Sequence, residues 1–193
     1  MALPKRRSGD SIPELITALL EELGEDPARA GLKATPDRVS RALRELTGGY
    51  RIRPEDVIAD AVFEQDYDEM VVVKDVPFYS LCEHHMLPFF GFCHVGYLPK
   101  GRVIGLSKIP RLIDVFAHRL QVQEKMTKEI AEALFLTLEP RGVGIVVEAR
   151  HLCMEMRGAQ KPGGHMMTSC MLGTFRKDPR TRAEFLALVK RRD

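Results

Sequence analysis

The sequence lacks the features that mark membrane, secreted and nucleic-acid-binding proteins. No apolar run is long enough to span a membrane as a helix, and the first residues lack the apolar core of a signal peptide. The 29 Lys and Arg residues nearly balance the 27 Asp and Glu residues, and the resulting net charge of +2 argues against a general nucleic-acid binder. We therefore expect a cytoplasmic protein that binds neither membrane nor nucleic acid.

Cysteine is also scarce, and the chain has only Cys82, Cys93, Cys153 and Cys170. Thiols stay reduced in the cytoplasm, so we expect these residues to be metal ligands or buried thiols rather than disulfides. A Cys82–Cys153 disulfide is the alternative, but it would leave the adjacent histidines unexplained. Cys93 and Cys170 lie among apolar residues, which favours a role as small buried hydrophobes.

The first third of the chain has the pattern of helices. An apolar stripe predicts a helix over 11–23. Asp26-Pro27 and Thr35-Pro36 each place a capping residue before a proline and so predict two further helix starts. The chain has 193 residues, of which 45% are hydrophobic, and this length suits one domain with a helical appendage.

The rest of the chain separates strands from helices. The segments rich in Val, Phe and Tyr predict strands over 57–63, 70–78, 89–98, 103–106, 143–153 and 166–175. Helical periodicity predicts helices over 107–120 and 123–138, and a last helix after Asp178-Pro179. Strands and helices in separate runs are typical of an α+β fold with an antiparallel sheet.

Two distant segments offer the ligands of a metal. Cys82 and His85 are separated by two residues, a spacing at which one turn can present two zinc ligands. Cys153 lies at the end of the strand predicted over 143–153, on the face that carries its alternate apolar residues. Three protein ligands and an open position are typical of a catalytic zinc, whereas a structural zinc has four ligands.

Two histidines beside these residues are candidates for proton transfer. His84 cannot easily share a metal with His85, because neighbouring side chains in an extended backbone point apart. It is then available as a general acid or base, and so is His151. A closed structural site remains an alternative, in which Cys93, His94 or His151 supplies the fourth ligand.

Further residues are candidates for binding an anionic ligand. Ser107 and Lys108 begin a predicted helix, where backbone N–H groups attract phosphate, and Arg111 follows one turn later. Arg157 comes shortly after the segment with Cys153. Each cation taken alone is best read as a surface residue, but their positions at a helix start and near the metal segment favour a polyphosphate site. Gln123-Glu124 begins the next helix, where the glutamate either complements the helix N-terminus or accepts hydrogen bonds from guanine.

Four motifs in order resemble the GTP cyclohydrolase I family, and the likeness runs from about Pro13 to the C-terminus. They are Cys-Glu-His-His at 82–85, Gly-Leu-Ser-Lys at 105–108, Gln-Val-Gln-Glu at 121–124 and His-Leu-Cys-Met-Glu-Met-Arg-Gly at 151–158. The resemblance implies a zinc-dependent hydrolase that opens the imidazole ring of GTP, releases formate and forms 7,8-dihydroneopterin triphosphate, the first step of pterin biosynthesis.

The resemblance also implies a role for each candidate. The zinc ligands would be Cys82, His85 and Cys153, and the catalytic histidines would be His84 and His151. The residues that would contact GTP are Glu124 at the guanine edge with Gln123 beside it, Ser107, Lys108, Arg111 and Arg157 at the ribose and triphosphate, and Arg38 from a neighbouring subunit.

The family's architecture adds expectations about fold and assembly. The resemblance implies the tunnelling fold, which is an antiparallel sheet backed by two helices, here with an N-terminal helical extension. We expect a tail and helical extension over 1–52 and a catalytic domain over 53–193. The subunits would form a toroidal homodecamer with active sites between subunits.

Two other functions remain as alternatives. One is the tunnelling-fold nitrile reductase that acts on a deazaguanine with NADPH, which needs a nucleophilic cysteine and no zinc. The paired histidines and Cys153 argue against it. The other is a non-catalytic assembly module stabilised by a four-ligand zinc, and the modest net charge disfavours RNA binding by such a module.

Overall fold

The computed structural model describes residues 11–58 and 61–190. The chain divides into two compact units, one within residues 1–46 and the other within residues 47–193. This division falls a few residues before the predicted boundary at 52–53. The assignment of the first unit to an extension and of the second to catalysis stays a prediction. In the described part, no helix is long and apolar enough to cross a membrane.

The first unit consists of α1 (Ile12–Glu22) and α2 (Thr35–Leu46), as the sequence predicted. Helix α1 begins with a capping box, in which the Ser11 backbone N–H donates to the Glu14 carboxylate at 2.5 Å. The helix predicted after Asp26-Pro27 is wrong, because residues 27–34 form turns. The Asp26 carboxylate instead accepts from the Ala28 N–H at 2.9 Å, which closes a local turn.

The second unit begins with short elements that precede the sheet. They are a 3-10 helix, η1 (Gly48–Arg51), then α3 (Pro54–Ile58) and β1 (Val62–Glu64). The strand predicted over 57–63 is wrong in its first two residues, since Val57 and Ile58 end α3, while residues 59–60 lie outside the described part. Pro54 begins that helix, and Glu55 and Asp56 in its first turn complement the positive helix N-terminus.

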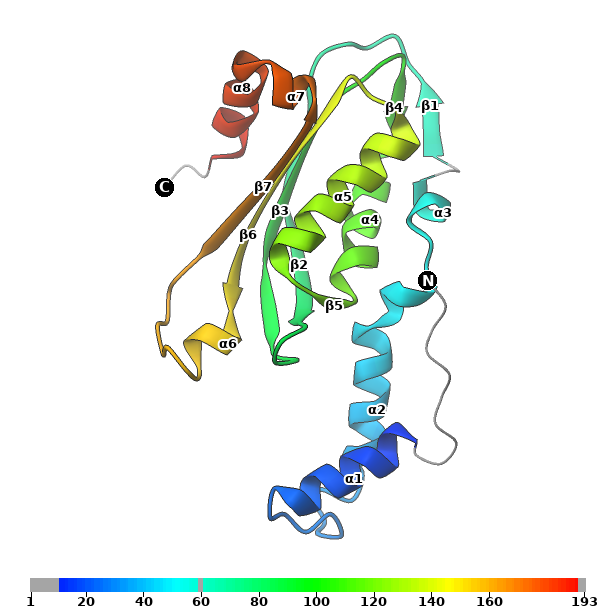
Figure 1. Cartoon of the computed structure of the whole chain (residues 1–193). Coiled ribbons are helices and arrows are strands. Elements are labelled where there is room, and N and C mark those ends of the chain that lie inside the picture. The colour runs from blue at the N-terminus through cyan, green and yellow to red at the C-terminus, as the bar shows by residue number, and fades with distance from the viewer. Residues whose placement is uncertain (1–10, 59–60, 191–193) are drawn as a thin grey trace. The chain divides into compact units, whose positions relative to one another are not determined.

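A five-stranded sheet forms the centre of this unit (Figure 1). Its order is β5 (Leu120–Gln121), β2 (Val71–Cys82), β3 (Pro88–Leu98), β6 (Gly142–His151) and β7 (Met166–Gly173). All neighbours are antiparallel except β5 and β2, which pair in parallel through two residue pairs. A separate two-stranded sheet joins β1 to β4 (Arg102–Ile104). The α+β class is therefore confirmed.

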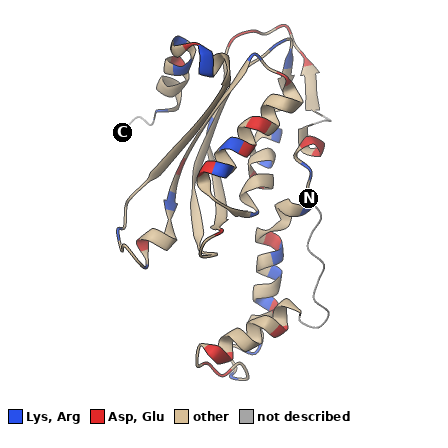
Figure 2. Cartoon of the chain, in the orientation of Figure 1, with Lys and Arg blue, Asp and Glu red and all other residues tan. Residues whose placement is uncertain are grey.

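Two helices cover one face of the sheet (Figure 1). They are α4 (Lys108–Ala117) and α5 (Gln123–Leu138), and α5 has the bounds that the sequence predicted. Alternate residues of β6 meet these helices, since Val143, Ile145, Val147 and Ala149 have no exposed surface. The strands carry few charged residues, whereas α5 carries several over 124–132 (Figure 2). Burial of this apolar layer is the main source of the unit's stability.

The opposite face of the sheet is covered only in part. The short α7 (Thr174–Lys177) and α8 (Pro179–Val189) place Phe175 and Phe185 edge to face over it, with ring centroids 5.4 Å apart. Gly144 lies beneath them, and a Cβ there would come within 2.6 Å of the Phe175 ring. Farther along this face, Tyr79 and Met167 are 64% and 65% exposed. The chain alone therefore leaves large apolar side chains in contact with water.

Candidate metal and catalytic site

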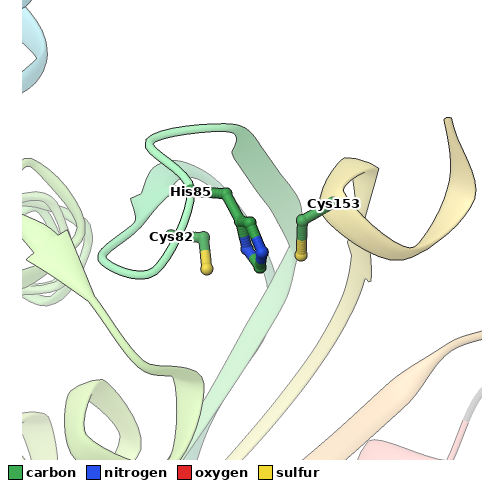
Figure 3. Close-up of side chains that lie close together, drawn as sticks. All are labelled: Cys82, His85 and Cys153. Carbon is green, nitrogen blue, oxygen red and sulfur yellow. The ribbon is translucent and has the colours of Figure 1, made fainter. Parts of the chain in front are cut away.

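A tight hairpin brings two of the predicted ligands together. Strand β2 ends at Cys82 and β3 begins at Pro88, and the turn between them is closed by backbone hydrogen bonds. The Met86 N–H donates to the Cys82 carbonyl at 2.7 Å, and the Cys82 N–H donates to the Leu87 carbonyl at 2.9 Å. Met86 has a φ of +54°, which turns the chain back on itself. His85 consequently points back toward the Cys82 thiol (Figure 3).

The third ligand comes from the end of the neighbouring pair of strands. Strand β6 ends at His151, and Cys153 lies in the short helix α6 (Leu152–Glu155) rather than in the predicted strand. A two-pronged ion pair holds that helix, because the Arg150 guanidinium donates to both Glu155 carboxylate oxygens at 2.8 and 2.5 Å. The helical turn aims the Cys153 thiol at the hairpin (Figure 3).

Cys82, His85 and Cys153 converge into one potential metal site. Their ligand atoms lie within 4.8 Å of one another, and all four cysteines of the chain are free thiols. Within residues 11–58 and 61–190, no fourth His, Cys, Asp or Glu joins the group. Partial burial, and then the nearby Cys82 thiol, raise the pKa of Cys153. A metal cation in the group would reverse this effect, because thiols bind metals as thiolates.

The other cysteines take no part in this group. Cys93 has no exposed surface and burial strongly raises the pKa of its thiol, so it is the buried hydrophobe that the sequence predicted. His94 also lies away from the group, with its Nδ1 accepting from the Asp75 N–H at 3.0 Å. These placements leave two of the three suggested fourth ligands unable to close the site.

His84 and His151 lie in contrasting surroundings beside the site. His84 is exposed on the hairpin, and its ring centroid is 6.3 Å from that of His85 with the planes nearly perpendicular. His151 is half-buried, and its ring stacks on Phe89 at 4.7 Å with an angle of 4°. Burial lowers the pKa of His151, and the negative charge of Glu124 opposes that shift. Glu124 therefore acts electrostatically on this histidine.

Comparisons with known proteins agree on one family. A family model described as GTP cyclohydrolase I matches residues 12–190. The chain belongs to the GTP cyclohydrolase I family. A protein of Coxiella burnetii named GTP cyclohydrolase 1 is 55% identical over 94% of this chain and 99% of its own length. One of Methylococcus capsulatus with the same name is 56% identical, over 92% of this chain and 96% of its own length. This chain is accordingly an enzyme of the GTP cyclohydrolase I type.

Likeness among solved structures is weaker. The apo form of an archaeosine synthase, QueF-Like, aligns with a TM-score of 0.44 and 18% identity, over 54% of this chain and 93% of that chain. A likeness at this level is too distant to indicate a fold or a function.

The residues that the GTP cyclohydrolase I resemblance assigned to GTP lie near the metal group, in the first compact unit and at the start of α4. Glu124 is exposed in the first turn of α5, and Arg157 is close enough for its charge to oppose the rise in the pKa of Cys153 that burial and Cys82 cause. Gln123 is 1% exposed and its amide faces protein atoms, so its side chain is not placed to contact a ligand. Arg38 is exposed on α2, in the other compact unit.

The cations of α4 lie at the start of that helix, away from the helix end that leads to Cys82. Helix α4 runs for 10 residues toward β5, and β5 pairs with Leu81 and Cys82. At 1.5 Å per residue, Lys108 is about 14 Å and Arg111 about 9 Å along the helix axis from the Ala117 end. Ser107 is the N-cap of the helix, and Lys108 and Arg111 belong to its first turn. On a single chain these residues and the metal group therefore lie toward opposite ends of α4.

Sequence reasoning missed the side chains that support His151. Phe89 pairs with His151 in the β3–β6 register, and Thr168 and Thr127 lie behind Gln123. Alternation along β6 placed His151 correctly on the core face. The pairing register that brings Phe89 against it depends on the hairpin, and the sequence alone gave no signal for it.

Proposed function

We propose that this enzyme is a zinc-dependent hydrolase that opens the imidazole ring of GTP, releases formate and forms 7,8-dihydroneopterin triphosphate. The observation that carries the proposal is the group of Cys82, His85 and Cys153, with ligand atoms within 4.8 Å, in a chain of the GTP cyclohydrolase I family. Two thiols and an imidazole form a donor set that suits Zn²⁺. Three ligands also leave a position open, as catalytic zinc requires.

The proton transfers are assigned to the two histidines that do not ligate. A bound zinc supplies a Lewis acid that lowers the pKa of water toward about 7. His84 extends from the exposed hairpin and is suited to exchange protons with the purine ring and with solvent. His151 lies half-buried against Phe89, where burial favours its neutral form and hence a proton acceptor. Glu124 is exposed one residue beyond Gln123 and accepts hydrogen bonds from the guanine edge.

We assign the triphosphate to α4 of a second copy of the chain. Arg157 is a basic residue near the metal group, while Ser107, Lys108 and Arg111 lie at the start of α4, about 9 to 15 Å along the axis from the helix end that leads to Cys82. On its own chain this helix start lies at the far end of α4 from the end that leads to Cys82, so one chain offers the cations and the metal group in separate places. A neighbouring copy that presents its own α4 would bring the two together, and Arg38 of a neighbouring copy is assigned to the same anion.

Open strand edges support the assembly of copies into a homodecamer with a tunnelling fold. Strand β7 is the last strand of the sheet, and β5 covers only Leu81 and Cys82 of β2 among the described residues. Long open edges pair readily with another strand. We propose that β2 of one copy pairs with β7 of the next, which closes a ring and encloses Tyr79 and Met167. We expect the assembly to act in the cytoplasm, where its thiol ligands stay reduced.

The test is turnover by metal-loaded protein. We expect incubation with GTP to release formate and to yield a pterin that fluoresces after oxidation. No formate from protein with full zinc occupancy would contradict the proposal. Zinc-free protein that oxidises NADPH with a deazaguanine nitrile would favour the reductase instead. Analytical ultracentrifugation tests the assembly separately, and a stable monomer with full activity would contradict active sites between subunits.

A further inference from the structure

Gln123 is completely enclosed, and its amide nitrogen is committed to the protein. The side chain begins α5 and is 1% exposed. Its Nε2, which carries two hydrogens, lies within hydrogen-bond distance of three acceptors, the Val147 carbonyl at 3.1 Å, the Met166 carbonyl at 3.0 Å and the Thr168 hydroxyl at 3.2 Å. Carbonyl oxygens only accept hydrogen bonds, so the nitrogen of the amide must face this side. The amide oxygen is thereby turned the other way.

Two threonines fix the same orientation independently. The Thr127 hydroxyl donates to the Gln123 backbone carbonyl at 2.7 Å, and this uses its one hydrogen. Thr127 must then accept in its contact with the Thr168 hydroxyl at 2.6 Å, so Thr168 donates there. Having used its hydrogen, Thr168 accepts from the Gln123 amide. Both hydroxyl hydrogens therefore have a defined direction, and flipping the amide would place its oxygen against atoms that only accept hydrogen bonds.

The amide oxygen that results faces His151. Gln123 Oε1 lies 2.7 Å from His151 Nε2. Since the oxygen carries no hydrogen, Nε2 must donate in this contact. The Phe89 ring, stacked at 4.7 Å with an interplanar angle of 4°, restrains the imidazole plane. The ring therefore has a defined plane, a defined rotation and a defined protonated nitrogen.

We propose that Gln123 is a positioning residue that holds His151 with a hydrogen on Nε2 and leaves Nδ1 to exchange the proton of the reaction. The inference rests on the proposed function only where it gives His151 a proton to exchange. It gives Gln123 a role distinct from the guanine contact of its neighbour Glu124. At the start of α5, the exposed Glu124 carboxylate would then contact the substrate, and the enclosed Gln123 amide would hold His151.

Solid-state ¹⁵N NMR of histidine-labelled, metal-loaded protein tests the assignment directly. The chain has six histidines, and a His151→Asn spectrum identifies the His151 signals by difference. Well above the pKa of imidazole, we expect wild-type His151 to show a protonated Nε2 and an unprotonated Nδ1. A wild-type signal with the hydrogen on Nδ1 overturns the proposal, whether or not any variant folds.

Gln123→Met removes the amide while keeping a side chain of similar length. We expect both neutral forms of the His151 ring to appear in the spectrum. We also expect kcat to fall about 10²-fold, the lower end of the rate enhancement from a positioned general acid or base, while KM changes little. Gln121→Met is the matched control, because Gln121 is also 1% exposed but its amide donates to Phe116 and Glu129. It should reduce the melting temperature without changing the His151 signals.

The outcomes separate this inference from the proposed function. An unchanged His151 signal and unchanged kcat in Gln123→Met overturn the positioning role. If the wild-type protein releases no formate but shows the expected Nε2 hydrogen, the proposed function fails and the hydrogen-bond assignment stands. If it releases formate but carries the hydrogen on Nδ1, the positioning role fails and the function stands.

Discussion

The metal group joins two regions that are held in different ways. The hairpin that carries Cys82, His84 and His85 lies at the surface, and backbone hydrogen bonds close its turn. The junction of β6 and α6 carries His151 and Cys153, and buried or half-buried side chains restrain it through Gln123 and the Arg150–Glu155 pair. The hairpin offers two candidate metal ligands and the junction one, and each region carries one further histidine. The contrast suggests that one histidine is free to follow the substrate while the other is fixed.

We expect the largest loss of activity from mutation of a proposed metal ligand, because the metal would connect the two regions. We expect Cys82→Ala and Cys153→Ala to lose zinc, measured by elemental analysis, and to lose at least about 10³-fold in turnover of GTP, because metal catalysis supplies several kcal/mol. Cys170→Ala is the control, since this thiol lies on β7 outside the group. Full activity in Cys82→Ala would exclude the metal mechanism.

His84→Ala tests the exposed histidine alone. Since His84 lies outside the ligand group and at the surface, we expect zinc content and melting temperature to stay at wild-type values. Turnover should fall about 10²- to 10⁴-fold through loss of a general acid or base. Loss of zinc in this variant would show that His84 acts on the metal, and the assigned division between His84 and His85 would then be wrong.

Arg150→Met loosens the junction without touching a ligand. The variant leaves the Glu155 carboxylate without its two-pronged partner, so α6 and Cys153 should be less well fixed. We expect zinc affinity, measured by chelator competition, to fall about tenfold, the low end for supporting residues of metal sites. Arg141→Met, just before β6 at the strand's other end, is the control. Equal effects of the two changes would contradict a local role for Arg150.

The smallest effect concerns acid stability. Burial lowers the pKa of His151 below its ordinary 6.5, so the unfolded chain takes up this proton first as pH falls. Stability should therefore decline from about pH 6.5 toward the folded pKa, and His151→Asn should flatten the decline. Because the ring is only half-buried, we expect a change of at most about 2 °C in melting temperature between pH 7 and 5. If the variant of exposed His165, His165→Asn, flattened the decline equally, the loss of stability at low pH would not be specific to His151.

The sequence predicted elements and ligands whose signals are local. The apolar period of 123–138 gave the bounds of α5, and the Cys-x-x-His spacing identified two of the three side chains that converge into a group able to hold a metal. Sequence-based prediction failed where one or two residues change the backbone from strand to helix. Pro54 converts the start of a predicted strand into α3, and the chain turns into α6 at Leu152, so Cys153 lies in a helix. Gln123 is polar beside a polar neighbour, and only the packing of α5 against β6 and β7 encloses it.

The 10-residue length of α4 predicts how mixtures of two inactive variants will behave. If guanine is held at one copy's thiols and phosphate at the next copy's helix start, a Cys82→Ala chain keeps a sound helix start and a Lys108→Ala chain keeps sound thiols. Randomly co-assembled in equal amounts, two inactive proteins would then regain about a quarter of the working sites. Dilution to a concentration at which the copies dissociate would abolish the activity of even the unmutated enzyme.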